Sequence, residues 1–206
     1  MAKNIVTVNV RLEGHQPLII HNSQLANPLN KWSKLMKDVT SKRKKTDADL
    51  LELQRLEFMG GMYFDELVGV YVPGQWFEAT VVAAMASIKR GQKKNVRGGL
   101  YVDTPKIPLE YDGPRTLEGL WESGKFHRLD IVGVQRSKIL RCRPCFQPPW
   151  AVEFSMTIIP EVLNVSDVQD AFVHASMLEG LGDYRPKFGR YNLTKFEASK
   201  PEKMAA

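Results

Sequence analysis

Cysteine is scarce in this chain, with two copies in 206 residues, and long apolar runs are missing. Two cysteines are too few for the disulfide framework of a small secreted domain, so we expect a reducing, cytoplasmic location. No apolar run approaches the roughly 18 residues of a membrane span. The first residues, Met-Ala-Lys-Asn, lack the apolar core of a signal peptide. We therefore expect no membrane partner.

The chain also lacks complete motifs for metal or nucleotide chemistry. Cys142 and Cys145 form a lone CxxC pair, without the second pair that a zinc site needs. Gly119 to Lys125 has the spacing of a phosphate-binding loop, but Phe126 replaces the Ser or Thr that would bind magnesium, and no strand precedes it. We expect no cofactor and no bound metal.

The overall composition, 43% hydrophobic and 25% charged, is typical of a globular protein. A chain of this length can bury most of its apolar surface in one core. We expect a single domain over residues 1–197, with an insertion at about 27–58. Residues 198–206 are expected to form a disordered tail.

Positive charge is in excess and is clustered. The chain has 29 lysines and arginines against 23 acidic residues, and Lys31 to Lys45 alone holds seven cations and one acid. Residues 89–97 hold five cations and residues 136–143 hold four, in both cases without an acid. Such dense patches are typical of a surface that binds phosphate groups, although a single patch is often only a solvated face.

Alternation and spacing predict the order of elements. Val6–Leu12 and Trp150–Ile158 alternate apolar and polar residues, as half-buried strands do. The turn Pro73-Gly74 leads into residues 75–88, whose apolar side predicts a core helix, and Ile131–Cys142 is predicted to be one strand. Ser166 and Gln169 have the spacing of a capping box at the start of a second core helix.

The region after the first strand is different. Lys31–Val39 is predicted to form a short basic helix, and Thr46 with Asp49 is predicted to cap another helix, closed by Gly60-Gly61. This insertion is expected to contribute little core. The whole pattern predicts an α+β fold, a mainly antiparallel sheet with helices on one face, plus a basic helical insertion. A ferredoxin-like, RRM-like core is the simplest such fold, and RNA-recognition modules use its open sheet face.

The stretch from Gly180 to Arg190 is predicted to be a contact loop. Its eleven residues include three glycines, three cations and two aromatic residues, and it has no apolar face of its own. It follows a predicted helix and precedes a predicted last strand, Tyr191–Phe196. The alternative is a solvated connection between these two elements.

Three segments carry a resemblance to a known family: Pro17 to His21 at the end of the first strand, Val70 to Gly74 before an alanine-rich helix, and the Gly-Leu-Gly…Phe-Gly-Arg-Tyr loop before the last strand. They occur in the order found in the RAMP superfamily, and the chain resembles the backbone subunits of CRISPR effector complexes. The resemblance implies a ferredoxin-like fold, sequence-independent binding of single-stranded RNA and head-to-tail association into a helical filament. A stand-alone relative of viral or mobile-element origin remains an alternative.

We therefore predict a non-catalytic protein that binds single-stranded RNA or DNA in a basic groove, with aromatic residues stacking on bases. Its predicted partners are the nucleic acid, further copies of itself and other effector-complex subunits. The predicted contacts are Lys42, Arg43, Lys44, Lys45, Lys89, Arg90, Lys93, Lys94, Arg97, Arg136, Lys138, Arg141, Arg143, Tyr184, Arg185, Lys187, Phe188 and Arg190.

Two other classes of function remain open at this point. His15 and His21 flank an apolar run and have the chemistry for acid–base catalysis in a metal-independent endoribonuclease. The other alternative is a protein-interaction module that mimics a backbone subunit and blocks assembly.

Overall fold

The structure is a computed structural model that describes residues 4–134 and 137–203. Its internal contacts divide the chain into two compact units. Unit 1 comprises Met1–Leu18, Tyr71–Asp112 and Pro148–Ala206, and unit 2 comprises Ile19–Val70 and Gly113–Gln147. The predicted insertion thus belongs with a second segment, 113–147, while the prediction of a single domain over 1–197 stays a prediction.

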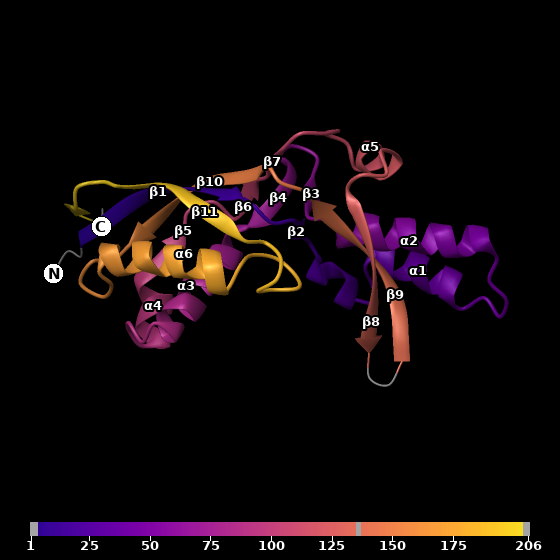
Figure 1. Ribbon diagram of the computed structural model, residues 1–206, viewed down its shortest axis with the longest axis horizontal. Coiled ribbons are helices and arrows are strands. Elements are labelled where there is room, and N and C mark those ends of the chain that lie inside the picture. Colours follow the sequence, from indigo (N-terminus) through magenta and orange to yellow (C-terminus); the bar gives the residue numbers. More distant parts are fainter. Residues whose placement is uncertain (1–3, 135–136, 204–206) are drawn as a thin grey trace. The chain divides into compact units, whose positions relative to one another are not determined.

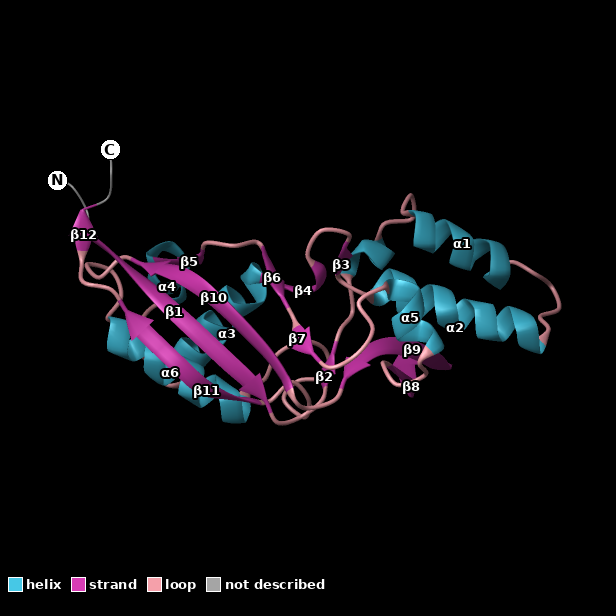
Figure 2. Ribbon diagram, turned by 90° about the horizontal axis from the view of Figure 1, so that it is seen from above, coloured by secondary structure: helices cyan, strands magenta, loops and turns pink. Residues whose placement is uncertain are grey.

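Unit 1 is built on an antiparallel sheet in the order β11-β1-β10-β5 (Figure 2). The short strand β7 pairs with β10, and β12 pairs with β1. Three helices belong to this unit. The elements are β1 (Asn4–Gly14), β5 (Leu100–Val102), β6 (Lys106–Pro108), β7 (Glu110–Tyr111), β10 (Trp150–Ile158), β11 (Tyr191–Ala198), β12 (Glu202–Lys203), α3 (Gly74–Ser87), α4 (Lys93–Gly99) and α6 (Val165–Leu178).

The helices α3 and α6 cover one face of this sheet (Figure 1). The face is apolar because alternate residues of the paired strands point to it, with Val8 opposite Met156 and Val10 opposite Phe154. The ring of Phe77 from α3 lies 4.2 Å, centroid to centroid, from that of Phe154. The predicted α+β fold, with an antiparallel sheet and helices on one face, is confirmed. The path β1-α3-β5-β10-α6-β11 follows a β-α-β-β-α-β order.

Unit 2 contains the helical insertion and a long β-hairpin. Strand β2 (Leu18–Ile19) lies where the chain enters it, and β4 (Gly69–Pro73) where the chain returns to unit 1. The antiparallel partners β8 and β9 form the hairpin. The remaining elements are the 3-10 helix η1 (Ser23–Ala26), α1 (Lys31–Thr40), α2 (Asp47–Gly61), β3 (Phe64–Asp65), α5 (Leu117–Glu122), β8 (His127–Val134) and β9 (Ser137–Phe146).

Helix α2 begins at the predicted cap and ends at the two glycines that were expected to close it. Thr46 and Asp49 form the capping box, since each side chain accepts a hydrogen bond from the other residue's backbone N–H. Gly60 and Gly61, which were expected to close the helix, form its buried last turn. A Cβ on Gly60 would lie 2.8 Å from the Cβ of Trp32, so the glycine allows close packing against α1. The insertion therefore contributes more core than predicted.

Three further elements differ from the prediction. Residues 131–142 were expected as one strand but belong to two antiparallel strands, β8 and β9, and the sequence Gln-Arg between them carries no Gly or Pro signal of a break. Helix α4 was not predicted, since two adjacent glycines end it. The N-cap of helix α6 is Asn164, two residues earlier than the expected cap at Ser166.

The end of the chain also differs from the prediction of a disordered tail from residue 198. Ala198 is the last residue of β11, opposite Val8, and Glu202 and Lys203 pair with Ile5 and Asn4. Backbone hydrogen bonding to β1 orders these residues despite their polar side chains. Within the described part of the chain, no helix has both the length and the apolar character to cross a membrane.

Candidate nucleic-acid interface

The predicted contact residues are divided between the two units, so each group is described within its own unit. Arg136 lies outside the described residues. Unit 2 contains Lys42, Arg43, Lys44, Lys45, Lys138, Arg141 and Arg143, and unit 1 contains Lys89, Arg90, Lys93, Lys94, Arg97, Tyr184, Arg185, Lys187, Phe188 and Arg190.

The loop between α1 and α2 is the most basic segment of unit 2, and its side chains are exposed. Two of its cations are used internally: Lys42 pairs with Asp49, and Lys45 Nζ donates to the carbonyl oxygen of Lys42 over 3.1 Å. The hydrogen bonds from Lys42 and from Thr46 lower the pKa of the Asp49 carboxyl to about 2. Within the described residues, Arg43 and Lys44 have no ion-pair or hydrogen-bond partner for their side chains. These two are available to an external anion.

The cations of strand β9 have different roles. The Arg141 guanidinium pairs with the carboxylate of Glu57, which is only 7% exposed and also accepts a hydrogen bond of 2.8 Å from the backbone N–H of Cys142. Arg143, on the same strand, also takes part in an interaction with other groups of the protein. Lys138 is exposed, and its ammonium has no partner in the part of the chain that is described. Sequence reasoning missed Glu57, because a single acid within an amphipathic helix carries no distinctive signal.

A cavity of about 350 Å³ opens beside this ion pair in unit 2. It brings together an imidazole, a buried carboxylate and two guanidinium groups, from His21, Glu57, Arg141 and Arg143. The thiol of Cys142 also lines it, and burial raises the pKa of that thiol to about 12. The cysteine is therefore a protonated wall residue, and Arg141 is neutralised by Glu57, which leaves the imidazole of His21 and the guanidinium of Arg143 as the groups that suit a phosphate.

The backbone of the Gly180–Arg190 loop in unit 1 is held at its base. The N–H of Leu181 donates to the carbonyl oxygen of Gly189 over 2.9 Å, and the N–H of Gly189 donates to that of Pro17 over 2.8 Å. The N–H of His15 donates to the carbonyl oxygen of Arg190 over 3.0 Å. Gly189 has a φ of +70°, and a Cβ there would lie 1.8 Å from the Leu181 oxygen. The backbone of this loop is thus held in one conformation by hydrogen bonds at its base.

The side chains at the tip of this loop face solvent. Lys187 Nζ lies 5.6 Å from the ring centroid of Phe188, whose ring meets that of Tyr184 edge-on at 6.3 Å. Arg190 Nε donates to the carbonyl oxygen of Pro186 over 2.9 Å, so this cation supports the loop itself. Arg185 is exposed, without a polar partner among the described residues. This end of the Gly180–Arg190 loop therefore offers cations beside aromatic rings.

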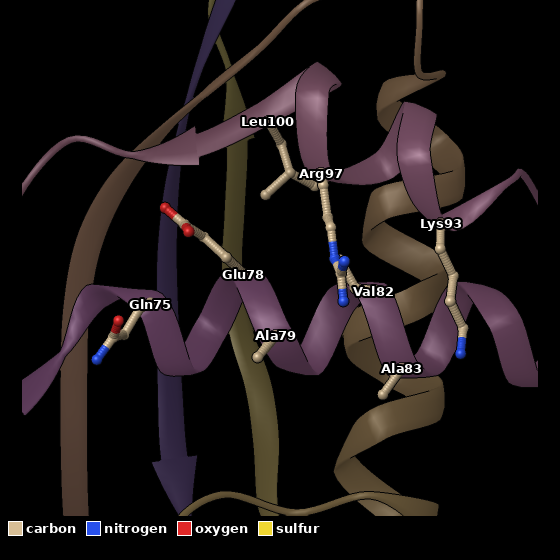
Figure 3. Close-up of a pocket in the computed structure, with 8 residues that line it drawn as sticks. All are labelled: Gln75, Glu78, Ala79, Val82, Ala83, Lys93, Arg97 and Leu100. Carbon is tan, nitrogen blue, oxygen red and sulfur yellow. The ribbon is translucent and has the colours of Figure 1, made fainter. Parts of the chain in front are cut away.

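The cations of residues 89–97 separate into three kinds. Arg90 pairs with Asp167, at 3.0 Å, and with Asp170, and these carboxylates raise its pKa. Lys89 and Lys94 are exposed. Lys93 and Arg97 reach from α4 toward α3 across a groove of about 550 Å³, whose floor includes Val82 and Ala83 (Figure 3). Only these last two share a concave surface.

The open face of the sheet is acidic. Arg11 pairs with Glu13 at 3.0 Å, with Glu110 at 2.7 Å and with Glu153 at 3.3 Å, and Lys195 pairs with Glu153 at 3.0 Å. The carboxylates outnumber the cations in this network, and the cations are already satisfied. A face of this kind repels a polyanion, so the loops are better placed than the sheet to contact nucleic acid.

The comparisons with known proteins bear on the fold. No protein-family model and no curated protein sequence matches the chain. A chain in the electron cryo-microscopy structure of Type III-B Cmr-beta bound to cognate target RNA is similar, with a TM-score of 0.54 and 12% sequence identity. The match covers 96% of the present chain and 61% of the other, so the present chain spans less than two thirds of that chain. At this identity the likeness concerns the fold alone.

Proposed function

We propose that the protein binds single-stranded nucleic acid, RNA in the first instance, without sequence preference, as a backbone-like subunit of a CRISPR-type effector complex. The observation that carries the proposal is a set of exposed cations that have no ion-pair or hydrogen-bond partner within the described residues and that lie on loops or a hairpin. They include Arg43, Lys44, Lys138, Arg185 and Lys187, the last of which also lies over the Phe188 ring.

The chemistry of these residues suits a nucleic-acid backbone. Lysine and arginine that are not neutralised by carboxylates release counterions when they bind phosphates, which gives affinity without sequence preference. Tyr184 and Phe188 beside Arg185 and Lys187 add ring faces for base stacking. The fold likeness to a chain of a complex determined with target RNA supports RNA as the substrate class.

The direct test compares two variants with equal charge change. Arg43→Ala/Lys44→Ala removes two unpaired cations, and Arg55→Ala/Lys195→Ala removes two that pair with Glu52 and Glu153. We expect the first variant to bind a single-stranded RNA of mixed sequence at least about tenfold more weakly, and the control to change much less, because only unpaired cations gain phosphate contacts. Equal losses would mean that net charge alone explains binding.

A second candidate function is supported by the cavity of unit 2. His21, whose imidazole has the chemistry of a general base, and Arg143, a cation that suits a phosphate, line one space. His21 would take the proton of the ribose 2′-hydroxyl as its oxygen bonds to phosphorus; the Arg143 guanidinium would bind a phosphate oxygen, and the departing 5′-oxygen would take a proton from water. Labelled RNA incubated with a chelator should then be cut by the wild type and not by His21→Ala. Intact RNA with the wild type would dismiss this candidate.

A further inference from the structure

The turn between β3 and β4 carries an apolar side chain that nothing covers. Leu67 is 97% exposed, more than any other large apolar residue in the described part of the chain, and Glu66 and Val68 beside it are also exposed. The turn is held by Asp65, whose Oδ1 accepts hydrogen bonds from the N–H of Leu67 at 2.9 Å and of Val68 at 3.2 Å. We call residues 65–69 the tip. It presents a leucine and a carboxylate on a fixed backbone.

The groove between α3 and α4 in unit 1 carries two cations, whereas the tip carries a carboxylate. Its floor is made of small and apolar side chains, Ala79, Val82, Ala83 and Leu100, and Lys93 and Arg97 extend over it from α4 (Figure 3). Glu78, the acid at its edge, accepts a hydrogen bond of 2.9 Å from the backbone N–H of Val102. Among the described residues, Glu78 forms no ion pair with Lys93 or Arg97, and the groove lining has no aromatic ring on which a base could stack.

We infer that the tip of one copy of this chain docks into the α3–α4 groove of a second copy. Leu67 would lie on the apolar floor, and the carboxylate of Glu66 would meet Lys93 and Arg97. The volume of about 550 Å³ accommodates a leucine with its neighbours. This inference rests on the proposed function and deepens it, because it names the surfaces through which copies join head to tail.

This contact predicts head-to-tail addition of copies. The tip and the groove are different surfaces, so the interface is heterologous, and copies joined in this way form a closed ring or an open chain. For Lys93 and Arg97, the apolar floor favours a protein segment over the phosphate contact predicted from the sequence. A nucleic acid in the groove is the competing occupant, and the experiment below distinguishes the two.

The experiment is sedimentation velocity of nuclease-treated, full-length protein over a range of concentrations. The wild type should grow with concentration, and Leu67→Ser should weaken association by roughly 30-fold, the value of burying one leucine side chain. Leu29→Ser is the matched control, because Leu29 is also a strongly exposed leucine of unit 2 and should leave association unchanged. A wild type that remains monomeric at every concentration would overturn the inference.

Mixing two defective variants tests the pairing itself. Leu67→Ser keeps an intact groove, and Lys93→Glu/Arg97→Glu keeps an intact tip. At a protein concentration where each variant alone is monomeric, an equimolar mixture should form a dimer and nothing larger. A mixture that remains monomeric while the wild type associates places the contact elsewhere. If the groove variant associates normally but loses RNA affinity, the groove holds nucleic acid and the inference is wrong. RNA binding by Leu67→Ser should be retained per monomer, so failure of the docking contact is distinguishable from failure of RNA binding.

Discussion

Replacing Gly14 with alanine is predicted to destabilise unit 1 and to loosen its basic loop. Gly14 is the last residue of β1 and lies opposite Trp150, whose indole covers it. A Cβ at residue 14 would fall 1.9 Å from Cε2 of Trp150, far inside any van der Waals contact. The indole is only 1% exposed, and its Nε1 donates to the carbonyl oxygen of Gln16 over 2.8 Å. It cannot move without losing packing and that hydrogen bond.

The magnitude follows from these two losses. Overpacking a core position costs about 1–3 kcal/mol and a lost buried hydrogen bond about 1 kcal/mol, so Gly14→Ala should lower the free energy of opening by about 2–4 kcal/mol. His15 and Gln16, which follow directly, donate backbone hydrogen bonds to the carbonyl oxygen of Arg190. The Gly180–Arg190 loop should therefore lose protection together with β1.

Hydrogen exchange followed by mass spectrometry is the suitable assay, because it reports each element separately in a chain of two compact units. Peptides from β1, β10 and the loop should exchange faster in Gly14→Ala. Gly98→Ala is the control: a Cβ there meets nothing within 4 Å, and alanine should stabilise α4 by up to about 1 kcal/mol. A change below about 0.5 kcal/mol in β1, within the range of a neutral surface substitution, would refute the reasoning, since it would mean that the indole has room to move.

Three further predictions concern unit 2. Burial raises the thiol pKa of Cys142 to about 12 and that of Cys145 to about 11, so neither should react with an aromatic disulfide reagent at neutral pH until the protein is unfolded; rapid reaction of the native protein would contradict this. Thr46→Ala removes the capping box and should cost about 1 kcal/mol of α2 protection in hydrogen exchange, whereas an unchanged α2 would show that tertiary packing alone sets its start. Because the bonds from Lys42 and Thr46 lower the pKa of Asp49 to about 2, its contribution to stability is complete above the unfolded pKa near 4 and is lost as the pH falls through about 2; a carboxyl that titrates near 4 in an NMR titration would be inconsistent with these bonds.

Much of unit 1 could be predicted from the sequence because its signals are local. The alternation at Val6–Leu12 and Trp150–Ile158 reflects the period of two that a half-buried strand requires, and these strands lie side by side at the centre of the sheet. The apolar side of α3 likewise faces that sheet. Pairing with β1 ordered the polar tail at Glu202 and Lys203, which no local pattern indicates, because backbone hydrogen bonds do not depend on side-chain type.

The functional surface was less predictable, since charge clusters in sequence do not reveal which cations are paired in space. Arg90 and Arg141 belong to predicted patches but are neutralised by Asp170 and Glu57, which lie far from them in the chain. Arg190, predicted as a contact, donates its Nε–H to a carbonyl oxygen of its own loop. Burial and pairing, which only the fold determines, therefore decide which members of a basic patch can meet a phosphate.

The most direct measurement of the central claim is the salt dependence of binding to a single-stranded RNA of mixed sequence. If Arg43, Lys44, Lys138, Arg185 and Lys187 each neutralise a phosphate, log affinity should fall linearly with log salt with a slope of about −3.5, which is 0.7 for each of the five contacts. Replacing all five with alanine should bring the slope close to zero and remove most of the affinity. A variant that keeps the slope of the wild type, or a wild type that retains no RNA even at about 50 mM salt, would contradict the account.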